Sequence, residues 1–107
     1  MNISFEEFAK LDLRTGIIKE AKIHPSADRL YVLKVDLGDK EIQLVAGIRK
    51  TYSPEELLGR RIVVLVNLEP KSLRGIESQG MLLAASTESG PVLLSPDKEV
   101  PAGIRVK

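Results

Sequence analysis

The chain has 107 residues, of which 43% are hydrophobic and 29% charged, a composition typical of one folded domain rather than of a disordered or fibrous chain. It has no cysteine and one histidine, His24, which excludes a disulfide framework, a thiolate nucleophile and a Cys/His zinc site. Sixteen basic residues nearly balance fifteen acidic ones, and the net charge of +1 excludes strong attraction of a polyanion by the molecule as a whole.

The first seven residues predict a short helix and no targeting signal. They carry acids where a secretory signal would carry lysines, and no apolar run in the chain is long enough to cross a bilayer. We therefore expect a cytoplasmic protein with no membrane partner. Ser4 and Glu7 form a capping box, and Ile3 and Phe8 have the spacing of a hydrophobic staple, so a helix is predicted over Phe5–Lys10.

Three strands joined by short turns are predicted to follow. The first runs from Leu11 to Ile23 with a bend or bulge at Gly16. Its inward face is expected to carry Leu11, Leu13, Thr15, Ile17, Ala21 and Ile23. A turn containing His24 and Pro25 leads to a second strand that begins near Leu30 and extends to Leu37. Gly38-Asp39 predicts a tight hairpin into a third strand through Ile42, Leu44 and Ala46.

The second half of the chain predicts a very short helix and two further strands. Ser53 as N-cap, Pro54 at the first helical position and Gly59 after the last turn delimit the helix. Ile62–Val66 is an unbroken apolar run that indicates a strand covered on both faces, and Met81–Ala85 predicts the fifth strand. Five strands with a helix between the third and fourth is the arrangement of an all-β, OB-fold barrel.

The whole chain, 1–107, is expected to form one domain, with the barrel core at about 11–86 and a C-terminal extension at 87–107. An OB-fold binds its ligand across the second and third strands, with the loops after the first and fourth strands closing over it. These loops are His24–Arg29 and the long segment Asn67–Met81. The segment from Arg49 to Arg74 contains six bases against three acids, so we expect the basic surface there.

Several motifs in this order resemble the tRNA-binding domain family, which occurs at the C-terminus or as the β subunit of methionyl-tRNA synthetases and in stand-alone tRNA-binding proteins. The motifs are Asp12-Leu13-Arg14-Thr15-Gly16, His24-Pro25-Ser26-Ala27-Asp28-Arg29-Leu30-Tyr31, Val45-Ala46-Gly47, Gly59-Arg60-Arg61, Asn67-Leu68-Glu69-Pro70 and Leu73-Arg74-Gly75-Ile76-Glu77-Ser78-Gln79-Gly80-Met81-Leu82-Leu83-Ala84. Glu69 departs from the base or small residue that the family often has before this proline.

The resemblance implies a non-catalytic module that binds the L-shaped body of tRNA with little dependence on sequence. It also implies a homodimer that uses its C-terminal segment, where the apolar Val92-Leu93-Leu94 piece would contribute, and a possible catalytic synthetase chain as a partner. No metal, other cofactor or small-molecule substrate is expected. With aromatic residues at only 4% there is little material for stacking bases, which also favours recognition of shape.

The expected nucleic-acid-binding residues combine cations, hydrogen-bonding side chains and one methionine. They are Arg29, Lys34, Arg49, Lys50, Asn67, Lys71, Arg74, Ser78 and Met81. Structural roles stay open for some of them: Asn67 could bond the end of its own strand, Ser78 could cap the loop and Met81 could pack in the core. Arg60 and Arg61 follow a helix end and could act only locally.

A purely structural role, as a dimerisation domain of a larger synthetase, is also compatible with the sequence. A chaperone and an enzyme make other demands. A dimeric peptide-binding export chaperone of the same superfamily would need an apolar groove and would bind with little dependence on salt. An enzyme would need a nucleophile, a base and an orienting acid that converge, and the sequence offers none around His24, whose loop position suggests turn formation.

Overall fold

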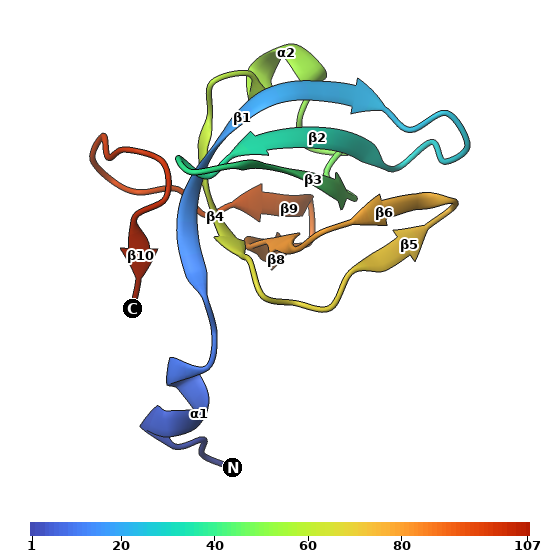
Figure 1. The fold of residues 1–107 in the computed structure, drawn as a ribbon. Coiled ribbons are helices and arrows are strands. Elements are labelled where there is room, and N and C mark those ends of the chain that lie inside the picture. Colours follow the sequence, from blue (N-terminus) through green and yellow to red (C-terminus); the bar gives the residue numbers. More distant parts are fainter.

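A computed structural model describes residues 1–107, which form one small barrel with two short helices (Figure 1). The helices are α1 (Phe5–Ala9) and α2 (Pro54–Leu57), and the strands are β1 (Leu13–Ile23), β2 (Tyr31–Asp36), β3 (Glu41–Ala46), β4 (Arg61–Leu65), β5 (Lys71–Leu73), β6 (Ile76–Ser78), β7 (Met81–Leu82), β8 (Ala84–Thr87), β9 (Gly90–Leu93) and β10 (Arg105–Val106). The main sheet has the order β3-β2-β1-β4-β7, and all of its pairs are antiparallel. The predicted OB-type barrel is confirmed.

The barrel closes where β3 approaches the segment that carries β6 and β7. One backbone hydrogen bond, from Gln79 N to Gln43 O at 2.8 Å, crosses this gap. Side chains supply the rest, because Gln79 Oε1 accepts from Gln43 N at 2.7 Å and Ser78 Oγ accepts from Val45 N at 3.0 Å. Side chains thus replace most of the backbone ladder at this edge.

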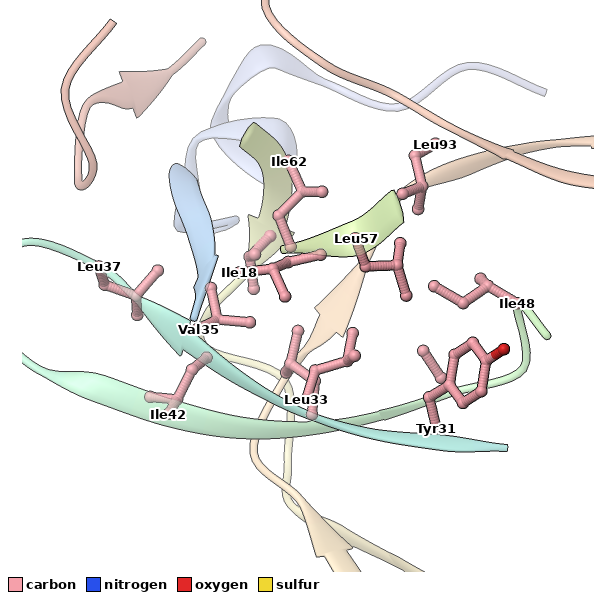
Figure 2. Packing of buried hydrophobic residues seen from close by; sticks show 13 residues of the cluster. Ile18, Tyr31, Leu33, Val35, Leu37, Ile42, Ile48, Leu57, Ile62 and Leu93 are labelled. Atoms are coloured by element: carbon pink, nitrogen blue, oxygen red, sulfur yellow. The ribbon is translucent and has the colours of Figure 1, made fainter. Parts of the chain in front are cut away.

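Thirteen buried side chains fill the barrel (Figure 2). The prediction for the inward face of β1 was partly wrong, because Ile18 rather than Ile17 is completely buried and Ile23 is 50% exposed. The alternation changes phase where Thr15 and Gly16 are both buried, and the pairing with β2 shifts again between Ile18 and Glu20. A Cβ at Gly16 would lie 2.7 Å from Val35 Cγ1, so close packing against β2 requires glycine there.

Both helices begin after the predicted N-caps, Ser4 and Ser53, and each cap forms a capping box, which was predicted for Ser4 alone. Helix α2 places the completely buried Leu57 in the core at one end of the barrel. Helix α1 buries no residue and stands apart from the barrel (Figure 1). Ile3 stays 64% exposed, so the predicted staple does not bury it.

The C-terminal part of the chain packs on the barrel. The single strand predicted over Met81–Ala85 is instead two strands, β7 and β8, and β8 pairs with β9. Leu93 belongs to the core, and β10 pairs with β1. Thr15 joins the two ends, since its N–H donates to Ile104 O at 2.9 Å and its hydroxyl donates to Pro101 O at 2.8 Å. No helix of the structure has the length and apolar character needed to span a membrane.

Candidate nucleic-acid interface

The long segment after β4 is a projecting β-hairpin rather than an open loop. β5 and β6 pair antiparallel, with Leu73 opposite Ile76. The two residues between them, Arg74 and Gly75, have φ of 53° and 89°, as a tight hairpin turn of the type with two positive φ values requires. In Figure 1 the tip of this hairpin and the loop between β1 and β2 extend from the same side of the barrel.

Lys71 and Arg74 are exposed on this hairpin, and neither takes part in an ion pair. The segment also carries Glu69 and Glu77, both exposed, so its formal charge is balanced. The hairpin alone therefore offers two free cations but no net positive field. An anionic ligand would need further basic groups near it.

Arg29, Arg49 and Lys50 form a second basic group, where the β1–β2 loop meets the turn after β3. Arg29 and Lys50 line one hollow together, and Arg49 Nη1 donates to Asp28 O at 2.6 Å. All three side chains are exposed. Lys34 is exposed on β2, in register with Gln43 of β3 and Glu20 of β1, and does not belong to this group.

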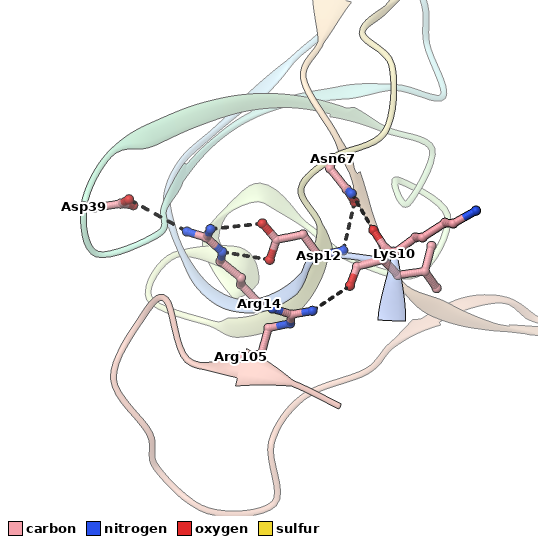
Figure 3. A network of polar contacts seen from close by, with 7 residues as sticks. Lys10, Asp12, Arg14, Asp39, Asn67 and Arg105 are labelled. Carbon is pink, nitrogen blue, oxygen red and sulfur yellow. Dashed lines mark hydrogen bonds and ion pairs between the residues drawn. The ribbon is translucent and has the colours of Figure 1, made fainter. Parts of the chain in front are cut away.

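Asn67 lies at the surface, but its side-chain amide is engaged in hydrogen bonds within the protein (Figure 3). Its Oδ1 accepts from Asp12 N at 2.9 Å and its Nδ2 donates to Lys10 O at 2.7 Å. The side chain thus attaches the segment before β1 to the start of the hairpin segment. The sequence left open a bond to the end of its own strand, and the structure shows bonds to a segment more than fifty residues away instead.

Ser78 is also engaged internally. It is 6% exposed, and its Oγ accepts from Val45 N and donates to Gly80 O, each at 3.0 Å. Met81, by contrast, is 46% exposed rather than packed in the core. It lines a hollow of about 230 Å³ beside the hairpin together with Val45, Leu68, Lys71 and Leu73.

Several charged side chains have local roles that the sequence did not specify. Arg14 binds both carboxylate oxygens of Asp12 at 3.0 Å, and its Nη1 lies 3.8 Å from Asp39 Oδ2 (Figure 3). The hydrogen bond from Arg14 lowers the pKa of Asp12 below its ordinary value. Arg60 lies over the Tyr52 ring at 5.2 Å, and Arg61 donates to Val100 O at 2.8 Å and pairs with Glu99.

His24 shows a contact that its loop position alone did not reveal. It is 2% exposed, Nδ1 accepts from Ser26 N at 2.9 Å, and Nε2 lies 3.0 Å from Leu73 O in the hairpin. The structure contains no group of three His, Asp or Glu side chains that could hold a metal ion.

Residues 13–105 match the family model described as "Putative tRNA binding domain". The chain is 64% identical over 105 residues to the methionine–tRNA ligase of Thermococcus kodakarensis. This match covers 98% of this chain and 14% of the ligase. It spans 14% to 15% of the length of the first curated relatives that it matches.

Two solved structures cover the whole of this chain. A MetRS related protein from Pyrococcus horikoshii has a TM-score of 0.92 and 40% identity, and 99% of its own length is matched. The chaperone CsaA from Bacillus anthracis has a TM-score of 0.90 and 35% identity, and 100% of its length is matched.

Proposed function

Because this chain belongs to the tRNA-binding domain family, we propose that it binds tRNA through the β5–β6 hairpin and the adjoining basic group, without catalysing a reaction. The observation that carries this proposal is that Lys71 and Arg74 are exposed and unpaired at the hairpin while Arg29, Arg49 and Lys50 gather at the neighbouring loops. Cations at separate points suit the phosphates of a folded RNA. We assign no catalytic step, because the matched family is a binding domain.

Recognition of tRNA shape, rather than of base sequence, is part of the proposal. Tyr31, the aromatic residue of the binding strands, is 2% exposed, and its hydroxyl donates to Tyr52 O at 2.7 Å. It therefore faces the core and offers bases no stacking surface. Proteins that read single-stranded bases rely on such stacking, whereas contacts to phosphates and 2′-hydroxyls report helix geometry.

The synthetase connection is a finer proposal. The methionine–tRNA ligase relatives are about seven times longer than this chain, and we propose that it is a domain or subunit that raises the tRNA affinity of such an enzyme. We further propose a homodimer in the cytoplasm. Val92 and Leu94 of the C-terminal extension are each 45% exposed, which supports a contact between copies there, and the lack of cysteine suits a reducing compartment.

Removal of both hairpin cations tests the binding surface. In K71A/R74A we expect tRNA affinity to fall about 30-fold, at about 1 kcal/mol per lost phosphate contact, and the slope of log affinity against log salt to fall by about two units. Filter binding or fluorescence anisotropy with bulk tRNA and with unstructured RNA of equal length, across a salt series, measures both quantities.

A matched control is K19A/K98A, which removes two exposed lysines outside both basic groups. Its net charge equals that of K71A/R74A, because each double variant loses two positive charges. It should retain most of the affinity. Equal losses in the two double variants would assign binding to net charge rather than to the hairpin.

A peptide-binding chaperone is the second candidate, supported by the similarity to the chaperone CsaA over the whole chain. The hollow lined by Val45, Leu68, Leu73 and Met81 is the apolar surface that such a ligand would use. Binding of an unfolded apolar peptide that persists at high salt and weakens in M81S, together with weak binding of tRNA, would favour this function.

A further inference from the structure

His24 is a buried polar residue whose two ring nitrogens are both occupied. The N–H of Ser26 can only donate, so Nδ1, 2.9 Å away, must accept and carry no proton. The proton of the neutral ring then lies on Nε2, which donates to Leu73 O at 3.0 Å. With 2% of the residue exposed, solvent does not compete strongly for either bond.

One of these bonds is local, and the other connects segments that are 49 residues apart in sequence. The Ser26 bond lies within the β1–β2 loop, which is further closed by the bond from His24 N to Leu30 O at 3.0 Å. The Leu73 bond reaches the last residue of β5, directly before Arg74 at the tip of the hairpin. On its other strand the hairpin is bonded to β3 of the barrel, where Gln43 Nε2 donates to Glu77 O and Val45 N donates to Ser78 Oγ.

The β1–β2 loop is in turn attached to the second basic group, because Arg49 Nη1 donates to Asp28 O at 2.6 Å. The contacts Arg49–Asp28 and His24–Leu73 therefore link the turn after β3, the β1–β2 loop and the hairpin. All of the free cations assigned to tRNA binding except Lys34 belong to these three segments.

We propose that His24 is a positioning residue that fixes the β5–β6 hairpin against the β1–β2 loop, so that the two basic groups face a ligand as one preorganised surface. Fixing the hairpin before binding removes the entropy cost of ordering it on the ligand. His24 itself contacts no RNA. The effect on affinity rests on the proposed tRNA binding, whereas the fixing of the hairpin does not.

Two conservative substitutions separate the two bonds of His24. In H24N the Oδ1 atom takes the place of Nδ1 and can accept from Ser26 N, but the side chain is too short to reach Leu73 O. In H24Q the Nε2 amide nitrogen takes the place of the imidazole Nε2 and can donate to Leu73 O, but nothing replaces Nδ1. If His24 only stabilised its own β1–β2 loop, the two variants would have similar effects on the hairpin, or H24N would have the smaller effect.

We expect H24Q to keep tRNA affinity within about twofold of wild type and H24N to lose about tenfold, the equivalent of one hydrogen bond. Amide hydrogen exchange around Arg74 to Ile76, measured without RNA, should be faster in H24N than in H24Q. Equal exchange in the two variants, or slower exchange in H24N, would overturn the proposal. If wild type binds no tRNA, the tRNA function fails, while exchange still decides the role of His24.

The protonation of the His24 ring can also be measured in the wild-type protein, without any variant. Nitrogen-15 spectra of the His24 ring should show one protonated nitrogen, Nε2, and one unprotonated nitrogen, Nδ1, at neutral pH. A ring that is protonated on Nδ1, or that averages between tautomers, would contradict the Leu73 bond and overturn the proposal.

Discussion

Replacement of Asn67 by alanine distinguishes an RNA contact from an internal one. Asn67 belongs to the motif that suggested RNA binding, yet both polar atoms of its amide bond the backbone at Lys10 and Asp12 (Figure 3). The variant N67A should therefore lose stability and keep its affinity for tRNA.

The size of the loss follows from the two bonds. Both hydrogen bonds lie at an exposed surface, so the freed backbone groups can bind water, and each bond is worth about 0.5 to 1 kcal/mol. N67A should lower the free energy of unfolding by about 1 to 2 kcal/mol, or its melting temperature by about 4 to 8 °C per kcal/mol. N67D should lose at least as much, because a carboxylate oxygen would then face the Lys10 carbonyl.

Urea unfolding followed by circular dichroism measures this loss, and tRNA titration below the onset of unfolding measures affinity. S72A is the matched control, since Ser72 is an exposed polar residue of the same segment. N67A with unchanged stability and at least tenfold weaker tRNA binding would refute the reasoning and make Asn67 an RNA contact.

Three further predictions concern stability. Arg14 lowers the pKa of Asp12, so the folded state binds a proton at this carboxylate less readily than the unfolded chain does. The resulting stabilisation is complete at neutral pH and disappears below about pH 4. D12N lacks this carboxylate, so in urea titrations it should lose less stability than wild type between pH 7 and pH 3. S78A leaves Val45 N and Gly80 O unpartnered in a buried site and should cost about 1 to 3 kcal/mol in urea unfolding, without changing the salt slope of tRNA binding. G103A adds a Cβ close to the Leu37 carbonyl oxygen, at a φ of 86°. In G59A, at a φ of 78°, the added Cβ meets no atom. Thermal melts should therefore show a stability loss of about 1 kcal/mol in G59A and a clearly larger loss in G103A.

The sequence predicted the elements that depend on local signals. Both N-caps, Ser4 and Ser53, lie where expected, since a cap and the backbone N–H that it binds are three residues apart. The β5–β6 hairpin was missed, although Leu73-Arg74-Gly75-Ile76 has an X-Gly pair between apolar residues. Arginine is uncommon at positive φ, so the usual Asn or Asp signal was lacking.

The roles of the individual polar residues depend on contacts between distant segments. Asn67 meets Asp12 across 55 residues, and Ser78 meets Val45 across 33. Periodicity and turn chemistry carry no information about such pairs. The exposure of Lys71 and Arg74 could be predicted from the sequence, because in this fold the segment after the fourth strand lies at the rim of the barrel; their contact with RNA stays a prediction.

The bond network at Thr15 has a kinetic consequence. Its hydroxyl accepts from the Ile104 amide, 89 residues away, so the contact closes a loop that includes most of the chain. Closing a loop of that length costs about 4 kcal/mol plus a constant. Because the strand pairs of β1, β2 and β3 close shorter loops, we expect this contact to form after them, late in folding. The tail therefore acts mainly on how slowly the barrel comes apart, and contributes little to how fast it assembles.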